Sequence, residues 1–156
     1  MDFDGGAAVV AGLVGGAVMI GLLYMGMAMM PTQMRMNLLR LLGTMMLPDG
    51  TMAYVAGLMI HAVMSIAFAL AHVGLYQAFD LESNLAAWGL LFGAVHWMIV
   101  GMGLGMMPLM HLGIRNKIIT APGPFALNLP KMTVVGFLML HLVYGVLVAV
   151  VYEALN

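Results

Sequence analysis

The chain has 156 residues, of which 64% are hydrophobic and 7% are charged. A soluble domain carries about 25% charged residues, so this composition excludes an ordinary soluble fold and indicates a membrane protein. The absence of cysteine excludes disulfides, thiolate catalysis, iron–sulfur clusters and covalently attached haem. The net charge is -1 and there is no basic block, so no binding to nucleic acid is expected.

Four stretches without Asp, Glu, Lys or Arg follow one another along the chain: 5–34, 50–79, 83–114 and 132–152. Each is long enough to supply the ~20 residues with which an α-helix crosses the hydrocarbon core. The alternating pattern of a membrane β-barrel is absent, and a backbone in lipid must satisfy its own hydrogen bonds. We therefore expect one all-α integral membrane domain over 1–156, folded as a four-helix transmembrane bundle.

The connections carry weaker signals. Apolar residues recur at helical spacing from Met34 to Met45, which predicts a short interfacial helix between the first two spans. Between the third and fourth spans, Ala121-Pro122-Gly123-Pro124-Phe125 is typical of a turn.

The basic residues predict the orientation of the bundle. They follow the first span or lie between the third and fourth spans: Arg35, Arg40, Arg115, Lys117 and Lys131. By the positive-inside rule these loops are cytoplasmic, which places both termini outside. The chain opens Met1-Asp2-Phe3-Asp4, without the basic residues of a signal peptide, so the first span is expected to be retained. The expected location is the bacterial inner (plasma) membrane.

An internal repeat organises the chain. One constant shift in residue number places Gly12-Leu13-x-x-Gly16 on Gly89-Leu90-x-x-Gly93, and Met29-Met30-Pro31 on Met106-Met107-Pro108. A slightly larger shift places His61-x-Val63-x-Ser65 on His141-x-Val143-x-Gly145. We infer two tandem two-helix hairpins, at about 5–79 and 83–154, related by an axis along the membrane normal.

Glycine spacing predicts where the helices meet. Gly-x-x-x-Gly lets two helix backbones approach closely in a membrane. The glycines expected at such contacts are Gly12, Gly16, Gly89, Gly93, Gly101 and Gly105.

The repeat also pairs His61 with His141 and Met19 with His96. At 1.5 Å per residue, all four lie roughly 15–18 Å from the cytoplasmic helix ends, near mid-membrane. Imidazole and thioether groups suit copper, and the same histidines could be axial ligands of haem b. We predict a metal or haem site at these four residues, with His72 and Tyr144 in secondary positions. The alternative is that the histidines bond across helices without a cofactor and the methionines fill space.

Other functions are also open. The chain could be a non-catalytic structural or accessory subunit of a larger membrane complex, or an oligomeric transporter. It has no Ser/His/Asp set, Walker loop or H-E-x-x-H motif, so an enzyme is not expected. The expected partners are the lipid bilayer and other membrane subunits or further copies of the chain.

Several of these motifs carry a resemblance. His61, Gly89-x-x-x-Gly93, Met106-Met107-Pro108 and His141-Leu142-Val143-Tyr144-Gly145 resemble an uncharacterised bacterial family of small four-span membrane proteins, known as a domain of unknown function. The resemblance covers most of spans two to four. It implies the four-span fold and no particular activity or ligand.

Overall fold

The structure, a computed structural model, describes residues 3–156 and is all-helical over that range. The long helices are α1 (Gly5–Met29), α3 (Thr51–Ala78), α4 (Leu85–Met110) and α6 (Lys131–Leu155). The short elements are α2 (Leu38–Gly43), α5 (Leu112–Arg115) and the 3-10 turn η1 (Pro124–Ala126). Each long helix is apolar and long enough to cross a membrane. The prediction of an all-α, multi-pass membrane bundle is therefore confirmed.

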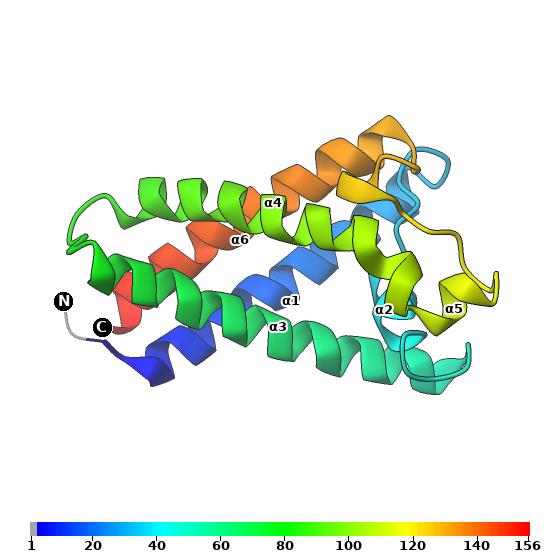
Figure 1. The fold of residues 1–156 in the computed structure, drawn as a ribbon. Helices are drawn as coiled ribbons and strands as arrows, with labels where there is room; N and C mark the ends of the chain where they lie inside the picture. The colour runs from blue at the N-terminus through cyan, green and yellow to red at the C-terminus, as the bar shows by residue number, and fades with distance from the viewer. Residues whose placement is uncertain (1–2) are drawn as a thin grey trace.

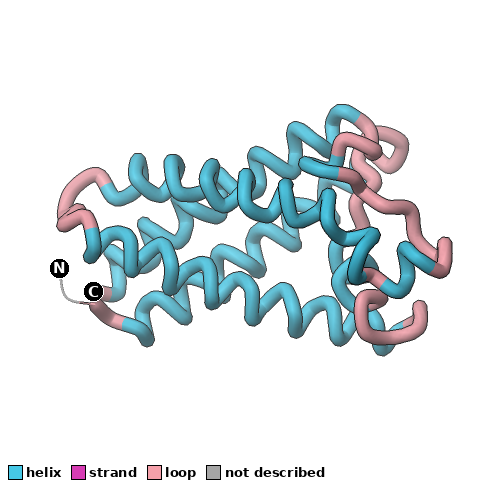
Figure 2. Tube along the Cα trace, in the orientation of Figure 1, coloured by secondary structure: helices cyan, strands magenta, loops and turns pink. Residues whose placement is uncertain are grey.

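The long helices run along one common axis, with the two chain ends at the same end of the bundle (Figure 1). There the backbone N–H of Asp4 donates a hydrogen bond to the hydroxyl of Tyr152, at 3.0 Å. The opposite end carries α2, α5, η1 and most of the loop residues (Figure 2). The five basic residues lie at this end, which we call the loop end.

Two connections differ in detail from the sequence-based expectation. The helix expected between Met34 and Met45 is confined to Leu38–Gly43, where the Asn37 side chain caps it by accepting from the N–H of Arg40. The expected turn at 121–125 overlaps η1, and Phe125 adopts a positive φ of 51°. The ring of Phe125 packs against Trp97, with centroids 4.8 Å apart, so this loop lies on α4.

The four long helices do not all contact one another equally. α1 packs against both α3 and α6, and α6 packs against α4, whereas α3 and α4 barely meet. The order around the bundle is thus α3, α1, α6, α4, with an incomplete contact between the last and the first.

Two of the close contacts are formed by glycine. A Cβ added to Gly12 of α1 would lie 2.8 Å from the carbonyl oxygen of Ser65 and 2.9 Å from Cβ of Ala69, both on α3. A Cβ added to Gly89 of α4 would lie 2.9 Å from Cβ of Ala149 and still closer to Gly145, both on α6. The predicted repeat pairs Gly12 with Gly89 and Ser65 with Gly145. The first glycine contact is therefore equivalent to the second.

The other predicted packing glycines fall into two groups. Gly16 lies against Ser65 of α3, and Gly93 lies against the backbone of His141 in α6. Gly101 and Gly105 instead face Phe125 and Pro124. They accommodate the η1 loop rather than a second membrane-spanning helix.

Candidate functional site

α3 and α4 meet only in the half of the bundle near the termini. Their contact there is a ladder of rings: Phe68 stacks on His96 with centroids 3.6 Å apart, and His72 lies 5.9 Å from both Phe92 and His96. Towards the loop end the two helices separate. A cavity of about 370 Å³ occupies this separated half.

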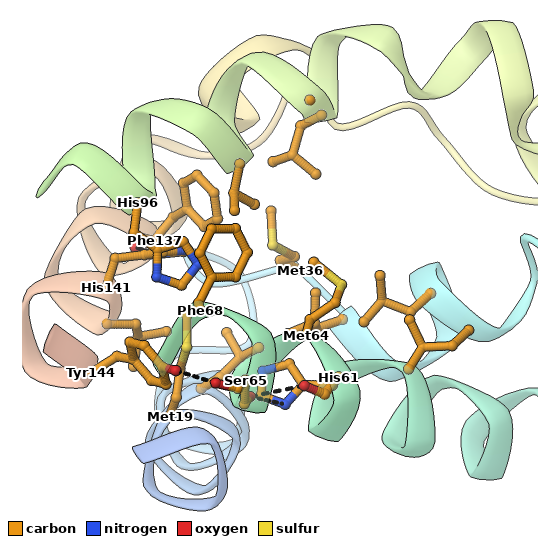
Figure 3. A pocket seen from close by; sticks show the side chains of 18 of the residues that line it. Met19, Met36, His61, Met64, Ser65, Phe68, His96, Phe137, His141 and Tyr144 are labelled. Carbon is orange, nitrogen blue, oxygen red and sulfur yellow. Dashed lines mark hydrogen bonds between the residues drawn. The ribbon is translucent and has the colours of Figure 1, made fainter. Parts of the chain in front are cut away.

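The cavity is lined by uncharged side chains from α1, α2, α3, α4 and α6, and from the segments before and after α2 (Figure 3). Its polar side chains are His61, Ser65, His96, Thr133, His141 and Tyr144. Its methionines are Met19, Met36, Met45, Met64, Met107 and Met110. The wall is therefore apolar, with imidazole and thioether groups set into it.

All four residues predicted as ligands line this cavity: Met19, His61, His96 and His141. The rings of His96 and His141 touch edge to face, with centroids 4.8 Å apart. His61 lies on α3, away from this pair (Figure 3). Within residues 3–156 there is no group of three or more His, Cys, Asp or Glu side chains arranged to hold a metal ion. The structure thus gathers the four residues around one cavity without converging three imidazoles on one point.

Hydrogen bonds define which imidazole nitrogens remain available. Nδ1 of His141 lies 2.6 Å from the carbonyl oxygen of Phe137, which only accepts, so Nδ1 carries the hydrogen. Nε2 of neutral His141 is then left with a lone pair. Nδ1 of His61 lies 3.4 Å from the hydroxyl of Ser65, which donates to the carbonyl oxygen of His61 at 2.8 Å.

The two secondary residues have different surroundings. His72 does not line the cavity; both of its ring nitrogens are buried with no hydrogen-bond partner in the described chain. Tyr144 lines the cavity, and its hydroxyl donates a short hydrogen bond to the carbonyl oxygen of Ser65. Tyr144 therefore connects α6 to α3.

The cavity reaches the surface of the bundle between α3 and α4. Ile99 and Gly103 of α4 line it and are exposed, with 52% of Ile99 accessible. Ile60 and Met64 of α3 line it and are half-buried. In a bilayer this surface faces lipid, so the cavity opens sideways towards the hydrocarbon.

Sequence reasoning missed two parts of this arrangement. Met64 and Phe68 follow His61 at helical spacing, so periodicity could have placed them on the same wall. His111 is fully buried: its Nδ1 accepts from the N–H of Ile114, and its Nε2 donates to the carbonyl oxygen of Leu41, at 2.7 Å. His111 thus connects the α4–α5 junction to α2, a contact between distant segments that no local pattern marks.

Searches with protein-family models, among curated proteins and among solved structures each find no match to this chain. The resemblance to a four-span bacterial family stays a prediction.

Proposed function

We propose that this protein binds, within the membrane, a small apolar molecule that carries a hydroxyl or N–H group. The observation that carries the proposal is the cavity of about 370 Å³, with imidazoles in an otherwise apolar, uncharged wall. Small-molecule sites are typically concave and mainly apolar, with volumes of about 300–1,000 Å³ and a few polar groups that orient the ligand.

The imidazoles in the cavity wall indicate which polar group the ligand carries. Because Nδ1 of His141 is held by Phe137, its Nε2 is a hydrogen-bond acceptor in an apolar wall. A ligand hydroxyl satisfies this acceptor, whereas a pure hydrocarbon leaves it unpaired, and an unpaired buried polar atom costs about 1–3 kcal/mol. The side opening between α3 and α4 admits a molecule already dissolved in the lipid.

Substitution at the cavity mouth provides the test. A Cβ added to Gly103 or to Gly21 meets nothing within 4 Å, but only Gly103 lines the cavity. In lipid nanodiscs, we expect 1-naphthol to raise the unfolding temperature of the wild type and of Gly21→Phe, and to have little effect on Gly103→Phe. Naphthalene, which lacks the hydroxyl, should stabilise the wild type less. An equal naphthol response in wild type and Gly103→Phe would rule out binding at this site.

A second candidate is the binding of a soft metal ion such as Cu(I), as the sequence predicts. The observation that favours it is that six methionines and three histidines line the same cavity. Thioether and imidazole groups are suitable Cu(I) ligands. His96, His141 and Met19 would hold the ion. Because the His96 and His141 rings touch, no haem macrocycle fits between this pair.

Anaerobic titration with Cu(I) against a competing chelator tests this second candidate. We expect affinity to fall in Met19→Leu and in His141→Leu, and to stay unchanged in Met29→Leu, because Met29 is 74% exposed and outside the cavity. Equal affinity in all four proteins would contradict it, and a Soret band in the purified protein would indicate haem instead.

We also infer the orientation and ancestry of the bundle. The basic loop end is placed in the cytoplasm of a bacterial inner membrane, with both termini outside. The matching glycine contacts of α1 with α3 and of α4 with α6 support two tandem hairpins. Because the chain lacks cysteine, single cysteines at Ser83 and Asn116 can be labelled with an impermeant maleimide. In intact cells only Ser83→Cys should react.

A further inference from the structure

A second cavity, of about 410 Å³, lies at the loop end of the bundle. Its walls come from two separate connections: the segment from Arg35 to Leu41, and the segment from Ile119 to Pro130. Unlike the central cavity, it contains two arginines, Arg35 and Arg40. The two arginines share this hollow with apolar side chains such as Met36 and Leu129.

The two arginines differ in what they already bind. Nε and Nη2 of Arg40 donate to the two carboxylate oxygens of Asp49, at 2.9 and 2.5 Å. The guanidinium of Arg35 has no hydrogen bond or ion pair with any residue in 3–156. The Arg35 backbone is nevertheless fixed, because its N–H donates to the hydroxyl of Thr133, which donates to the carbonyl oxygen of Gln33. Arg35 thus carries a positive charge without a partner in residues 3–156, on a segment held in place by its hydrogen bonds to Thr133.

The charge at this end favours an anion. The loop end carries five basic residues, and Asp49 is its one carboxylate among residues 3–156. The other described carboxylates, Asp4, Asp80, Glu82 and Glu153, lie at the opposite end. The cavity is lined by Pro130, directly before the start of α6 at Lys131, and the end of a membrane-spanning helix is at the level of the lipid headgroups. Basic pockets at such positions bind anionic lipid headgroups.

We propose that this second cavity is a binding site for a phosphate group, supplied by the headgroup of an anionic lipid. Arg35 contributes the free guanidinium, whose planar donors match phosphate oxygens. The apolar walls then contact the glycerol and the first part of the acyl chains. The proposal does not depend on the function of the central cavity.

Native mass spectrometry of the full chain tests this site, with phosphatidylglycerol and phosphatidylcholine as the probes. The decisive variant is Arg35→Gln, and the matched control is Arg115→Gln, which removes the same charge at the same end but outside the cavity. We expect the wild type to retain phosphatidylglycerol in preference to phosphatidylcholine. Arg35→Gln should weaken that binding about tenfold, the effect of losing a charge-assisted hydrogen bond, and Arg115→Gln should change it less than about twofold.

The outcomes separate the possible phosphate sources. Retention of phosphatidylglycerol in the presence of millimolar inorganic phosphate supports the lipid as the ligand. Displacement by inorganic phosphate overturns the lipid assignment and leaves a site for the free anion. Equal retention of both lipids, or equal effects of the two variants, overturns the site. Because the Arg35 side chain is exposed and makes no described polar contact, its replacement should leave the fold intact.

Discussion

The α1–α6 contact and the α3–α4 contact occupy equivalent places in the predicted repeat, yet only the first is closed. At the closed contact, a Cβ added to Gly15 of α1 would lie 3.0 Å from the ring of Tyr144 in α6. The equivalent position in the second hairpin is Phe92 of α4, whose ring meets His72 and Tyr76 of α3 at 5.9 and 5.5 Å. Glycine thus lets α1 and α6 approach closely, whereas α3 and α4 meet here through their rings.

The central cavity lies beside the looser of the two contacts, between α3 and α4. Lipid tails are as apolar as the helix surfaces, so no hydrophobic force closes a gap between membrane helices, and close packing depends on small residues. Between α3 and α4 the contact consists of large rings near the termini rather than of glycine. The central cavity lies beyond these rings, towards the loop end, where the two helices separate.

The largest expected effect comes from disrupting the close glycine contact between α4 and α6. Gly89→Val places side-chain carbons against Gly145 and Ala149 of α6, so we expect it to destabilise the fold by about 3 kcal/mol or more. Gly103→Val, on the open side of the same helix, should be close to neutral because its Cβ meets nothing within 4 Å. Circular dichroism during SDS unfolding measures both, and similar losses would contradict the contrast between the two sides.

A smaller effect on stability is expected from removal of the Tyr144 hydroxyl. This hydroxyl connects α6, at its close contact with α1, to α3. Tyr144→Phe keeps the ring against Gly15 and removes the hydrogen bond to Ser65, so we expect a loss of about 1 kcal/mol. The control is Tyr54→Phe, which removes an exposed hydrogen bond from Asn37 and should cost less than about 0.5 kcal/mol. The same SDS titration compares them, and an unchanged Tyr144→Phe would show that the hydroxyl contributes nothing to the bundle.

The smallest effect is expected at the loop end, outside both helix contacts. The Arg40 guanidinium hydrogen-bonded to Asp49 lowers the pKa of that carboxyl below its ordinary 3.8. A lowered pKa stabilises the fold fully above the ordinary value, and this contribution disappears as the pH falls through the lowered pKa. The pair is solvent-exposed, so its contribution is small.

Melting temperatures of the wild type and Asp49→Asn should therefore differ slightly at neutral pH and converge as the pH falls through the lowered pKa of Asp49. Asp80→Asn, which removes a carboxylate at the opposite end, provides the control. A difference that widens on acidification would contradict a stabilising role for the Arg40–Asp49 pair.

Most of the fold could be predicted from local sequence. The charge-free stretch 50–79 contains α3 at Thr51–Ala78, and 83–114 contains α4 at Leu85–Met110, because charged side chains are unfavourable in hydrocarbon. The residues at which each helix begins and ends within its charge-free stretch could not be predicted from local sequence. α4 stops at Met110, where His111 leaves the helix to bind the distant Leu41.

The sequence by itself determined four apolar helices and the grouping of basic residues at one end, and it predicted a common level for Met19, His61, His96 and His141. Each follows from local composition or from spacing along a helix of constant rise. Only the tertiary structure decided which helices touch. Packing depends on the facing side chains of two helices at once, which the sequence of either helix alone does not specify. The folded structure therefore decided the separation of α3 from α4, the space beside them, and the position of His61 away from the His96–His141 pair.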